Sequence, residues 1–435
     1  MKFGGTSVGM PQRMHGVAKL ISENTGSKIV VLSAIAGTTN SLVAISDLLS
    51  KSDRIGAKQQ IVALEKQYRT FIQELVINPS SLQVAENILK EHFEFLNIIL
   101  RISYSEALNK DILAQGELLS SKLFSAYLQE QGIDHVLISA LEFMTIDSDD
   151  EPQIGNIKVK LSQLLQQHKS KNLFITQGFV CRNAKGEVDN LKRGGSDYSA
   201  SLISAAVGAE VCEIWTDISG MHNCDPAFVN NTIPIDNLSF DEAAELAYFG
   251  AKILHPASIW PAQQYNIPVK LLNTMEPHAK GTFINADATS KGVKAIAAKD
   301  GITAINIKSS RMLLAYGFLR KVFQIFEKYK TPIDMVTTSE VAVSVTIDNL
   351  SFLKNIIKEL DLLGVVSVDR DQTIVCIVGN ELASDASFLT KVFDNLSETD
   401  VRMVSYGGSA HNISILIPGI QKKAVLQKLN KGLFG

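Results

Sequence analysis

The stretch Lys2-Phe3-Gly4-Gly5-Thr6-Ser7-Val8-Gly9 brings one lysine, three glycines and two hydroxyl side chains together near the start of the chain. Glycine lets backbone N–H groups approach an anion closely, and a lysine beside such a loop can reach phosphate oxygens. The spacing is not a Walker A motif, because Gly9 is followed by Met10-Pro11 instead of Lys and Ser or Thr. Alone, the stretch is compatible with a phosphate-binding loop and equally with a flexible glycine-rich terminus.

The composition is that of a globular protein, and its length of 435 residues suggests about three domains. Hydrophobic residues make up 46% and the formal net charge is -3, which gives no electrostatic reason to expect nucleic acid or an anionic membrane as partner. The four cysteines lack CxxC spacing, so we expect neither a protein-built metal site nor a disulfide framework. With no signal peptide or membrane-spanning run, we expect a cytoplasmic protein.

Strand-like and helical segments alternate over the first two thirds of the chain. Residues 29–32, 173–176 and 213–215 are short apolar runs typical of buried strands, and 41–131 has mostly helical periodicity. This alternation predicts an α/β fold with a mostly parallel sheet and helices on both faces.

Polar motifs follow the ends of the predicted strands. Ser33, Gly178 and Asp217 each come directly after strand residues, and Gly194-Gly195 opens a helix. Ligands of open α/β sheets bind beyond the carboxyl ends of the strands. Several polar clusters at that edge therefore favour a ligand site over a set of unrelated turns.

The pattern changes after a small, polar stretch at 285–300, and two similar passes follow. The first predicts a βαββαβ unit with strands at 311–315, 333–338, 341–347 and 365–368 and helices at 318–329 and 351–363. The second has strands at 373–378, 401–406 and 412–417 and helices at 385–397 and 420–431, and it lacks a last strand. The unassigned strand 302–307 supplies it in our prediction, so that a first unit at 309–370 is inserted into a second unit formed by 301–308 and 371–435.

Together these motifs resemble the aspartate kinases of the amino-acid kinase superfamily, over essentially the whole chain. The resemblance rests on KFGGTSVG at 2–9, VLSAIAGTTN at 31–40, QGE at 115–117, TQGF at 176–179, RGGSDYSA at 193–200, WTDISG at 215–220 and FGAKILHP at 249–256. It implies a three-layer αβα, carbamate kinase-like catalytic domain at 1–292, followed by two ferredoxin-like βαββαβ ACT domains. The implied reaction is phosphorylation of the L-aspartate side chain by ATP, giving 4-phospho-L-aspartate, the first step toward lysine, threonine and methionine.

This chemistry needs no general base, because an ionised carboxylate is already a nucleophile; positioning and charge stabilisation carry the catalysis. The resemblance assigns Lys2 to the transferring phosphoryl group, with Asp197 organising Lys2 or the metal–nucleotide end. It assigns Arg193 to the substrate α-carboxylate and Glu117 to its ammonium group. It further implies substrate contacts from Ser33, Thr39, Phe179 and Ser196, and nucleotide contacts from Lys2, Gly4, Gly5, Thr6, Ser7, Thr216, Asp217, His222, Lys252 and Ile253, with Mg²⁺ bridging the ATP phosphates.

Taken singly, several of these residues have a structural explanation. Glu117 alone is compatible with a solvated residue at a helix start, where acids are favoured. Ser33 and Thr39 are typical of caps and turns. Arg193 and Asp197 are close enough in sequence for a salt bridge within one loop. The ordered set of motifs favours the functional interpretation.

ACT repeats imply feedback by an amino acid, and this pair resembles the lysine-sensitive, single-function type. Asp334 and Glu340 would meet the ammonium groups of the effector, although Asp334 alone is also compatible with a residue that ends a strand. Ala315 replaces a serine often found there, so threonine, or both amino acids, remain open as effectors. ACT pairs associate across subunits, which implies a homodimer or tetramer. The expected effector positions are Met312, Ala315, Phe318, Leu319, Ile333, Asp334, Ser339 and Glu340.

Two departures from the family pattern leave alternatives open. His222 and Ala227 stand where an aromatic residue and an arginine are usual, so we expect weaker ATP binding. Only Met1 precedes Lys2, so we expect either that the first strand is nearly absent or that the true start of the protein lies upstream. A catalytically weakened ACT amino-acid sensor is one alternative, and a kinase for another small amino acid is the second. The pairing of Glu117 with Arg193 favours an α-amino acid as substrate.

Overall fold

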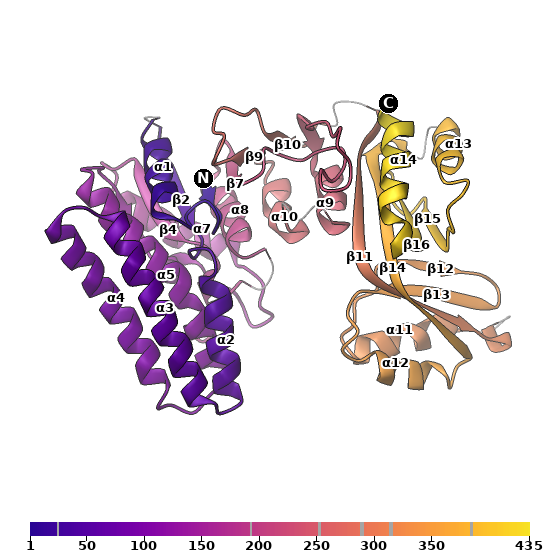
Figure 1. The fold of residues 1–435 in the computed structure, drawn as a ribbon, viewed down its shortest axis with the longest axis horizontal. Coiled ribbons are helices and arrows are strands. Elements are labelled where there is room, and N and C mark those ends of the chain that lie inside the picture. The colour runs from indigo at the N-terminus through magenta and orange to yellow at the C-terminus, as the bar shows by residue number, and fades with distance from the viewer. Residues whose placement is uncertain (24–25, 192–193, 251–253, 288–290, 313–315, 383–385) are drawn as a thin grey trace. The chain divides into compact units, whose positions relative to one another are not determined.

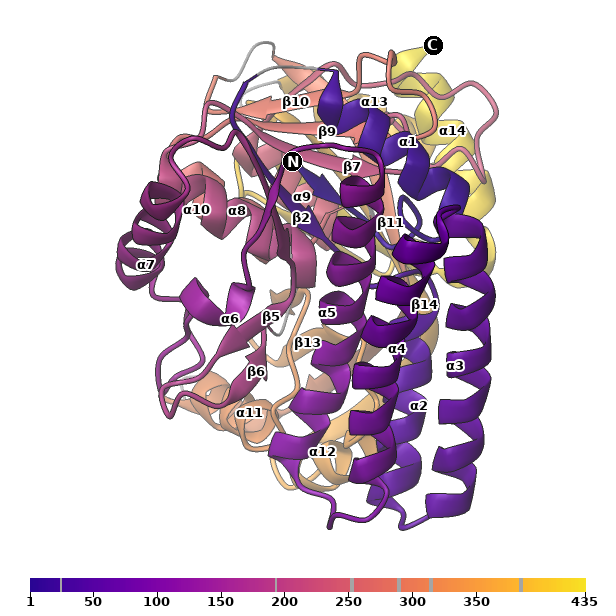
Figure 2. The same cartoon turned by 90° about the vertical axis from the view of Figure 1, so that its left-hand side faces the viewer.

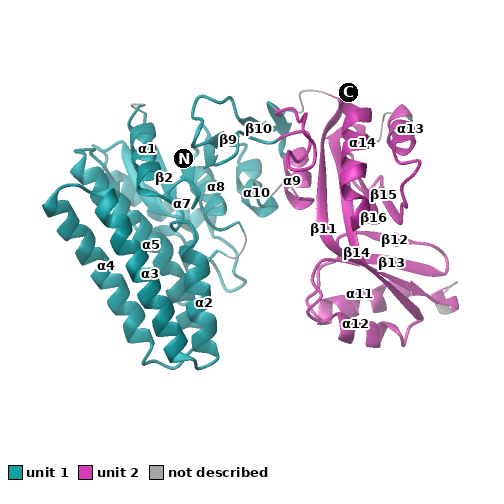
Figure 3. Ribbon diagram, viewed as in Figure 1, with its two compact units in different colours: residues 1–221, 236–240, 253–287 teal, residues 222–235, 241–252, 288–435 magenta. Residues whose placement is uncertain are grey.

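In the computed structural model the chain forms two compact units (Figure 3). Unit 1 comprises residues 1–221, 236–240 and 253–287, and unit 2 comprises 222–235, 241–252 and 288–435. The structure describes residues 1–23, 26–191, 194–250, 254–287, 291–312, 316–382 and 386–435. None of the helices in these ranges is both long and apolar enough to cross a membrane.

Unit 1 is built on an eight-stranded sheet in the order β3-β4-β2-β1-β7-β9-β10-β8 (Figure 1). Every neighbouring pair is parallel except β9 and β10, so the predicted mostly parallel sheet is confirmed. The strands are β1 Lys2–Phe3, β2 Lys28–Leu32, β3 Val136–Leu137, β4 Leu173–Gln177, β7 Cys212–Thr216, β8 Asn237–Ser239, β9 Val269–Asn273 and β10 Thr282–Asn285. Strand β1 is only two residues long, as expected, yet it pairs with both β2 and β7.

Helices cover both faces of this sheet because its strands are apolar on both sides. Val30, Leu32 and Ile175 join a core cluster with residues of helices α1 to α5, whereas the alternate residue Val31 is buried outside that cluster. Helix α8 contacts β1, β2 and β7. The helices of this unit are α1 Pro11–Ser22, α2 Thr38–Ser50, α3 Arg54–Leu75, α4 Pro79–Ile99, α5 Glu106–Glu130, α6 Ala140–Phe143, α7 Ile154–Gln167, α8 Gly195–Val207 and α10 Pro256–Gln264.

Two further features of unit 1 frame the site. Helices α2 to α5 are long and lie side by side (Figures 1 and 2). A short antiparallel hairpin, β5 Val180–Arg182 and β6 Val188–Asn190, forms around the turn at 183–186, and β6 contacts α5. The Asn183 N–H donates to the Glu187 carbonyl across this turn, at 3.0 Å.

Unit 2 contains a six-stranded antiparallel sheet in the order β12-β13-β11-β14-β16-β15. Its strands are β11 Gly292–Lys308, β12 Val336–Thr338, β13 Ala342–Ile347, β14 Val365–Asn380, β15 Met403–Tyr406 and β16 Asn412–Pro418. Its helices are α11 Phe318–Lys328, α12 Leu353–Leu360, α13 Ala386–Asn395 and α14 Lys422–Phe434, with 3-10 turns η1 Ser310–Met312 and η3 Gly419–Gln421. Helix α9, Phe240–Tyr248, begins in unit 1 and continues in unit 2.

The two repeats share the long strands β11 and β14. Residues 303–308 of β11 pair with β13, and residues 372–378 of β14 pair with β16. The expectation that residues 301–308 supply the missing strand of the second repeat is therefore wrong. The strand beside residues 374–380 of the second repeat is formed by residues 292–299. The expected strand at 311–315 is also wrong at its start, since residues 310–312 form η1, and 313–315 lie outside the described residues. Each half of the sheet has its own apolar cluster.

Candidate active site

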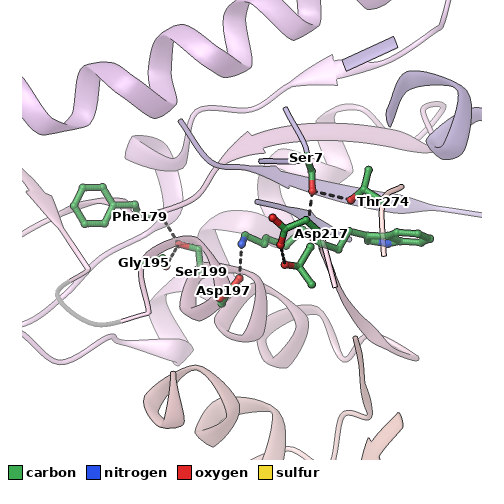
Figure 4. A network of polar contacts seen from close by, with 10 residues as sticks. Ser7, Phe179, Gly195, Asp197, Ser199, Asp217 and Thr274 are labelled. Atoms are coloured by element: carbon green, nitrogen blue, oxygen red, sulfur yellow. Dashed lines mark hydrogen bonds and ion pairs between the residues drawn. The ribbon is translucent and has the colours of Figure 1, made fainter. Parts of the chain in front are cut away.

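Lys2 and Asp197 meet in unit 1 although they lie far apart in the sequence. The Lys2 Nζ lies 2.5 Å from the Asp197 Oδ1, and the side chains are 10% and 17% exposed (Figure 4). Lys2 is held by the β1 pairings on both sides, and Asp197 lies in the first turn of α8. The ion pair therefore joins the two glycine-rich motifs into one site.

The glycine-rich loop after β1 lies close to Lys2. The Gly4 N–H donates to the Trp215 carbonyl at 3.2 Å, and a Cβ on Gly4 would lie 3.5 Å from the Lys2 Nζ. A Cβ on Gly5 would lie 3.0 Å from the Ala34 carbonyl oxygen, so this loop packs tightly on the segment after β2. Thr6 is exposed. The loop is therefore held against β7 and the segment after β2, with Gly4 beside the Lys2 ammonium group.

Ser7 is fully buried, and its hydroxyl forms hydrogen bonds within the protein. The Ser7 Oγ shares a 2.7 Å hydrogen bond with the Thr274 Oγ1 and lies 3.4 Å from the Trp215 carbonyl oxygen (Figure 4). It therefore ties the loop after β1 to the ends of β7 and β9. Thr274 was missed in the sequence, although its place just after an apolar strand was a usable signal.

The start of α8 is locked to the turn after β4. A Cβ on Gly178 would lie 2.3 Å from the Ser196 Cβ, so only glycine fits at 178. Phe179 has a φ of 65°, and its N–H donates to the Ser199 Oγ at 2.8 Å. Gly194 has a φ of 71°, in the left-handed region that glycine tolerates. The turn fixes Ser196 and Asp197 in place; Ser199, also missed, supplies the hydrogen bond.

Glu117 lies in the interior of α5 and is 4% exposed. The alternative of a solvated residue at a helix start is therefore wrong. Burial raises the pKa of Glu117 to about 7, against the opposing effect of hydrogen bonds from the Ala34 backbone and of the Lys2 charge. Within the described part of the chain, its Oε2 has no hydrogen-bond partner. Such a carboxylate is available to a cationic ligand group.

The remaining substrate and nucleotide positions are distributed along the strand ends. Ser33 follows β2 and its N–H donates to the Phe3 carbonyl at 3.2 Å, and Thr39 is exposed in the first turn of α2. Thr216 ends β7, and its hydroxyl donates to the exposed Asp217 carboxylate at 3.1 Å. His222 belongs to unit 2, where its Nδ1 hydrogen-bonds the Thr232 hydroxyl at 2.9 Å. Arg193, Lys252 and Ile253 lie outside the described residues.

Several expected effector positions lie around the α11 half of unit 2. Phe318 is buried in its core cluster, and Met312 and Ile333 pack against that cluster. Leu319 is 38% exposed. Ser339 and Glu340 are exposed in the turn before β13, where the Ser339 N–H donates to the Ala342 carbonyl. Ala315 lies outside the described residues.

Asp334 has a more specific environment than a residue that merely ends a strand. Its Oδ1 accepts hydrogen bonds from the Lys299 Nζ at 2.7 Å and from the Tyr248 hydroxyl at 2.9 Å, and its side chain is 2% exposed. Neither Lys299 nor Tyr248 belongs to a motif visible in the sequence, so both were missed.

Comparison with known proteins identifies the family of this chain. Residues 1–273 match the amino acid kinase family, and residues 375–433 match the ACT domain. The chain is 33% identical to the lysine-sensitive aspartokinase 3 of Escherichia coli, covering 100% of this chain and 98% of that protein. It is 35% identical to the chloroplastic aspartokinase 3 of Arabidopsis thaliana, covering 100% of this chain and 81% of the relative.

Solved structures agree over the same length. The crystal structure of E. coli aspartokinase III in complex with aspartate and ADP, in the R-state, has a TM-score of 0.87 and 32% identity, covering 100% of this chain and 99% of that one. The complex of the same enzyme with lysine and aspartate, in the T-state, has a TM-score of 0.83 and 33% identity over equal shares. This chain therefore belongs to the amino acid kinase family and, within it, to the aspartokinases.

Proposed function

We propose that this protein transfers the γ-phosphate of ATP to the side-chain carboxylate of L-aspartate, giving 4-phospho-L-aspartate, the first step of lysine, threonine and methionine biosynthesis. The observation that carries the proposal is the Lys2–Asp197 ion pair, which closes one site from the two glycine-rich motifs. The similar E. coli enzyme has been solved with aspartate and ADP bound, which supports the same substrates here.

Lys2 has the central role in the proposed transfer. Its ammonium group stands over Gly4 and beside Asp197, where it stabilises negative charge on the transferring phosphoryl oxygens. Asp197 fixes the position of that ammonium group. The substrate carboxylate is itself the nucleophile, so a side-chain base is not required, and the reaction depends on holding two anions together in line.

Glu117 provides the means to select an α-amino acid. Its buried carboxylate, with one oxygen lacking a partner in the described structure, suits the substrate ammonium group. Arg193 suits the substrate α-carboxylate, because its planar guanidinium group binds two oxygens at once. Ser33, Thr39, Phe179 and Ser196 complete the proposed aspartate site.

We assign the nucleotide to the loop after β1 and to the end of β7. Gly4, Gly5, Thr6 and Ser7 would contribute chiefly backbone groups, since the Ser7 hydroxyl is bonded to Thr274. Thr216, Asp217, His222, Lys252 and Ile253 are the other proposed contacts. Mg²⁺ fits as a part of the nucleotide substrate: the described residues contain no group of three His, Cys, Asp or Glu suited to hold a metal, and Mg²⁺ usually binds through substrate phosphates and water.

The regulation that we propose is inhibition by L-lysine bound to the ACT repeats of unit 2. The lysine-bound T-state structure of the similar E. coli enzyme supports this effector. The proposed ligands are those expected from the sequence, with Asp334 and Glu340 facing ammonium groups. We further propose a homodimer or tetramer formed through the ACT domains. We assign each strand segment of unit 2 to the ACT repeat whose strands it pairs with, as described above.

The test is turnover of ATP and L-aspartate with hydroxylamine, which traps an acyl phosphate as a hydroxamate, with and without L-lysine. We expect product with aspartate and not with glutamate, and inhibition by lysine. Lys2→Met should abolish the hydroxamate signal, because methionine keeps the length of the side chain without its charge. Product formation by Lys2→Met would contradict the role of Lys2, and turnover that ignores lysine would contradict the effector.

A further inference from the structure

Asp334 is an anion that already holds a primary ammonium group. The Lys299 Nζ, from β11, lies 2.7 Å from its Oδ1, and the Tyr248 hydroxyl donates to the same oxygen at 2.9 Å. The Lys299 Nζ also lies 4.8 Å from the centre of the Tyr248 ring. The Asp334 side chain is 2% exposed, and a carboxylate removed from water in this way is strongly destabilising without a cation beside it.

Only one of the two carboxylate oxygens of Asp334 accepts hydrogen bonds from the described residues. Its Oδ2 is buried and has no hydrogen-bond partner within the described residues. Two carboxylate oxygens together accept about four hydrogen bonds, and the described residues supply two donors, Lys299 and Tyr248. An incoming ammonium group therefore has a free acceptor on Asp334, the Oδ2, before Lys299 has withdrawn from the Oδ1.

Lys299 has a second ion-pair partner, Asp348. Its Nζ lies 3.0 Å from the Oδ2 of Asp348, which follows β13 and whose side chain is 42% exposed. If the Nζ moves away from Asp334, it remains paired with Asp348 at a more hydrated position. Withdrawal of Lys299 therefore leaves no isolated buried cation.

We infer that Lys299 is an internal competitor for the effector site: its ammonium group occupies Asp334 when no effector is bound, and an amino-acid effector binds by exchanging its own ammonium group for that of Lys299, which withdraws to Asp348. This inference rests on the proposed regulation by lysine. It adds that Lys299 sets the effector concentration at which the site is half occupied. Effector affinity is the intrinsic affinity of Asp334 for an ammonium group reduced by this competition.

The experiment is titration calorimetry of L-lysine into the full chain and its variants. Lys299→Met keeps the apolar part of the side chain and removes the competing charge, so the Kd for lysine should fall by about tenfold or more. Lys299→Arg keeps the charge and should bind lysine within about threefold of the wild type. Asp348→Asn removes the alternative partner of Lys299, which then leaves Asp334 less readily. The Kd of this variant for lysine should therefore rise about threefold or more.

Two comparisons separate exchange from a general effect of charge. In the Lys299→Met background, Asp348→Asn should have no further effect, because Asp348 acts only through Lys299. The matched control is Lys428→Met, which removes another lysine of unit 2 from its carboxylate partner, Glu398, at 2.6 Å, and should leave the Kd unchanged. Circular dichroism on every variant identifies loss of folding.

Failure of the inference is distinguishable from failure of the proposed function. If the wild type binds lysine and Lys299→Met binds it equally or more weakly while remaining folded, the exchange is overturned and regulation by lysine stands. If the wild type binds no lysine, both the effector and the exchange are overturned. The aspartate kinase activity is tested separately, by the hydroxamate assay without lysine.

Discussion

Glu117 should make the ligand-free protein less stable at neutral and alkaline pH than an uncharged residue would. Its pKa is raised from 4.5 to about 7 by burial, so the folded state retains a proton that the unfolded state has already lost. One pKa unit corresponds to about 1.4 kcal/mol, and the whole shift to about 3 kcal/mol. This cost is absent well below pH 4.5, grows as the pH rises toward 7, and is complete above that.

Glu117→Gln removes the ionisation with almost no change of shape. We define the difference as the free energy of unfolding of Glu117→Gln minus that of the wild type, and it should increase by about 2 kcal/mol between pH 5 and pH 8. The raised pKa of Glu117 destabilises the folded wild type by about 1 kcal/mol at the lower pH, where the folded state must retain a proton, and by about 3 kcal/mol at the higher pH, where the buried carboxylate is ionised. Urea unfolding at several pH values, without substrate, measures the difference. The same variant should have a raised aspartate KM, because the substrate ammonium group loses its counter-charge.

Two measurements can contradict these roles of Glu117. A stability difference that stays constant from pH 5 to pH 8 would show that Glu117 ionises normally in the folded protein. Saturating L-aspartate should stabilise the wild type more than Glu117→Gln, because binding to the folded state alone raises stability. Equal stabilisation of the two proteins would contradict the contact between Glu117 and the substrate.

Three further predictions test the geometry of the site. Gly178→Ala places a Cβ 2.3 Å from the Ser196 Cβ and should lower kcat/KM about 100-fold or more in the hydroxamate assay, whereas Gly155→Ala, with no atom within 4 Å, should leave it unchanged. Asp197→Asn removes the partner of Lys2 and should lower kcat about 100-fold with little change in the aspartate KM; a change confined to KM would contradict this role. Thr274→Val leaves the buried Ser7 hydroxyl without its 2.7 Å partner, at a cost of about 1 kcal/mol, and should raise the ATP KM about fivefold; an unaltered ATP KM would separate the Ser7 loop from the nucleotide.

The sequence determined the fold class and predicted the residues of the candidate site, because both depend on local patterns. The alternation of apolar strands with helices predicted the mostly parallel sheet. The glycine-rich stretches at 2–9 and 193–200 marked the segments that contain Lys2 and Asp197. These signals lie within a few residues of the chain, where backbone preferences and the spacing of apolar residues act directly.

Strand pairing in the ACT region was decided only by the tertiary structure. Residues 302–307 have the pattern of a strand, but that pattern does not specify a neighbour. In the structure they form the end of a 17-residue strand, β11, that contributes to both halves of the sheet. The two halves are interleaved because the long strands continue from one half into the other, and a register between distant segments leaves no local mark in the sequence.

Burial and charge pairing were likewise decided by the tertiary structure. Nothing in the sequence around Glu117 indicates that its carboxylate is 4% exposed, and Lys299 has no motif that connects it to Asp334. Desolvation depends on all the segments that pack around a group, and an ion pair depends on where distant segments meet. The sequence by itself therefore determined the fold class and predicted which residues take part in the chemistry, and the tertiary structure decided the burial of those residues, their partners and the stability cost of holding them.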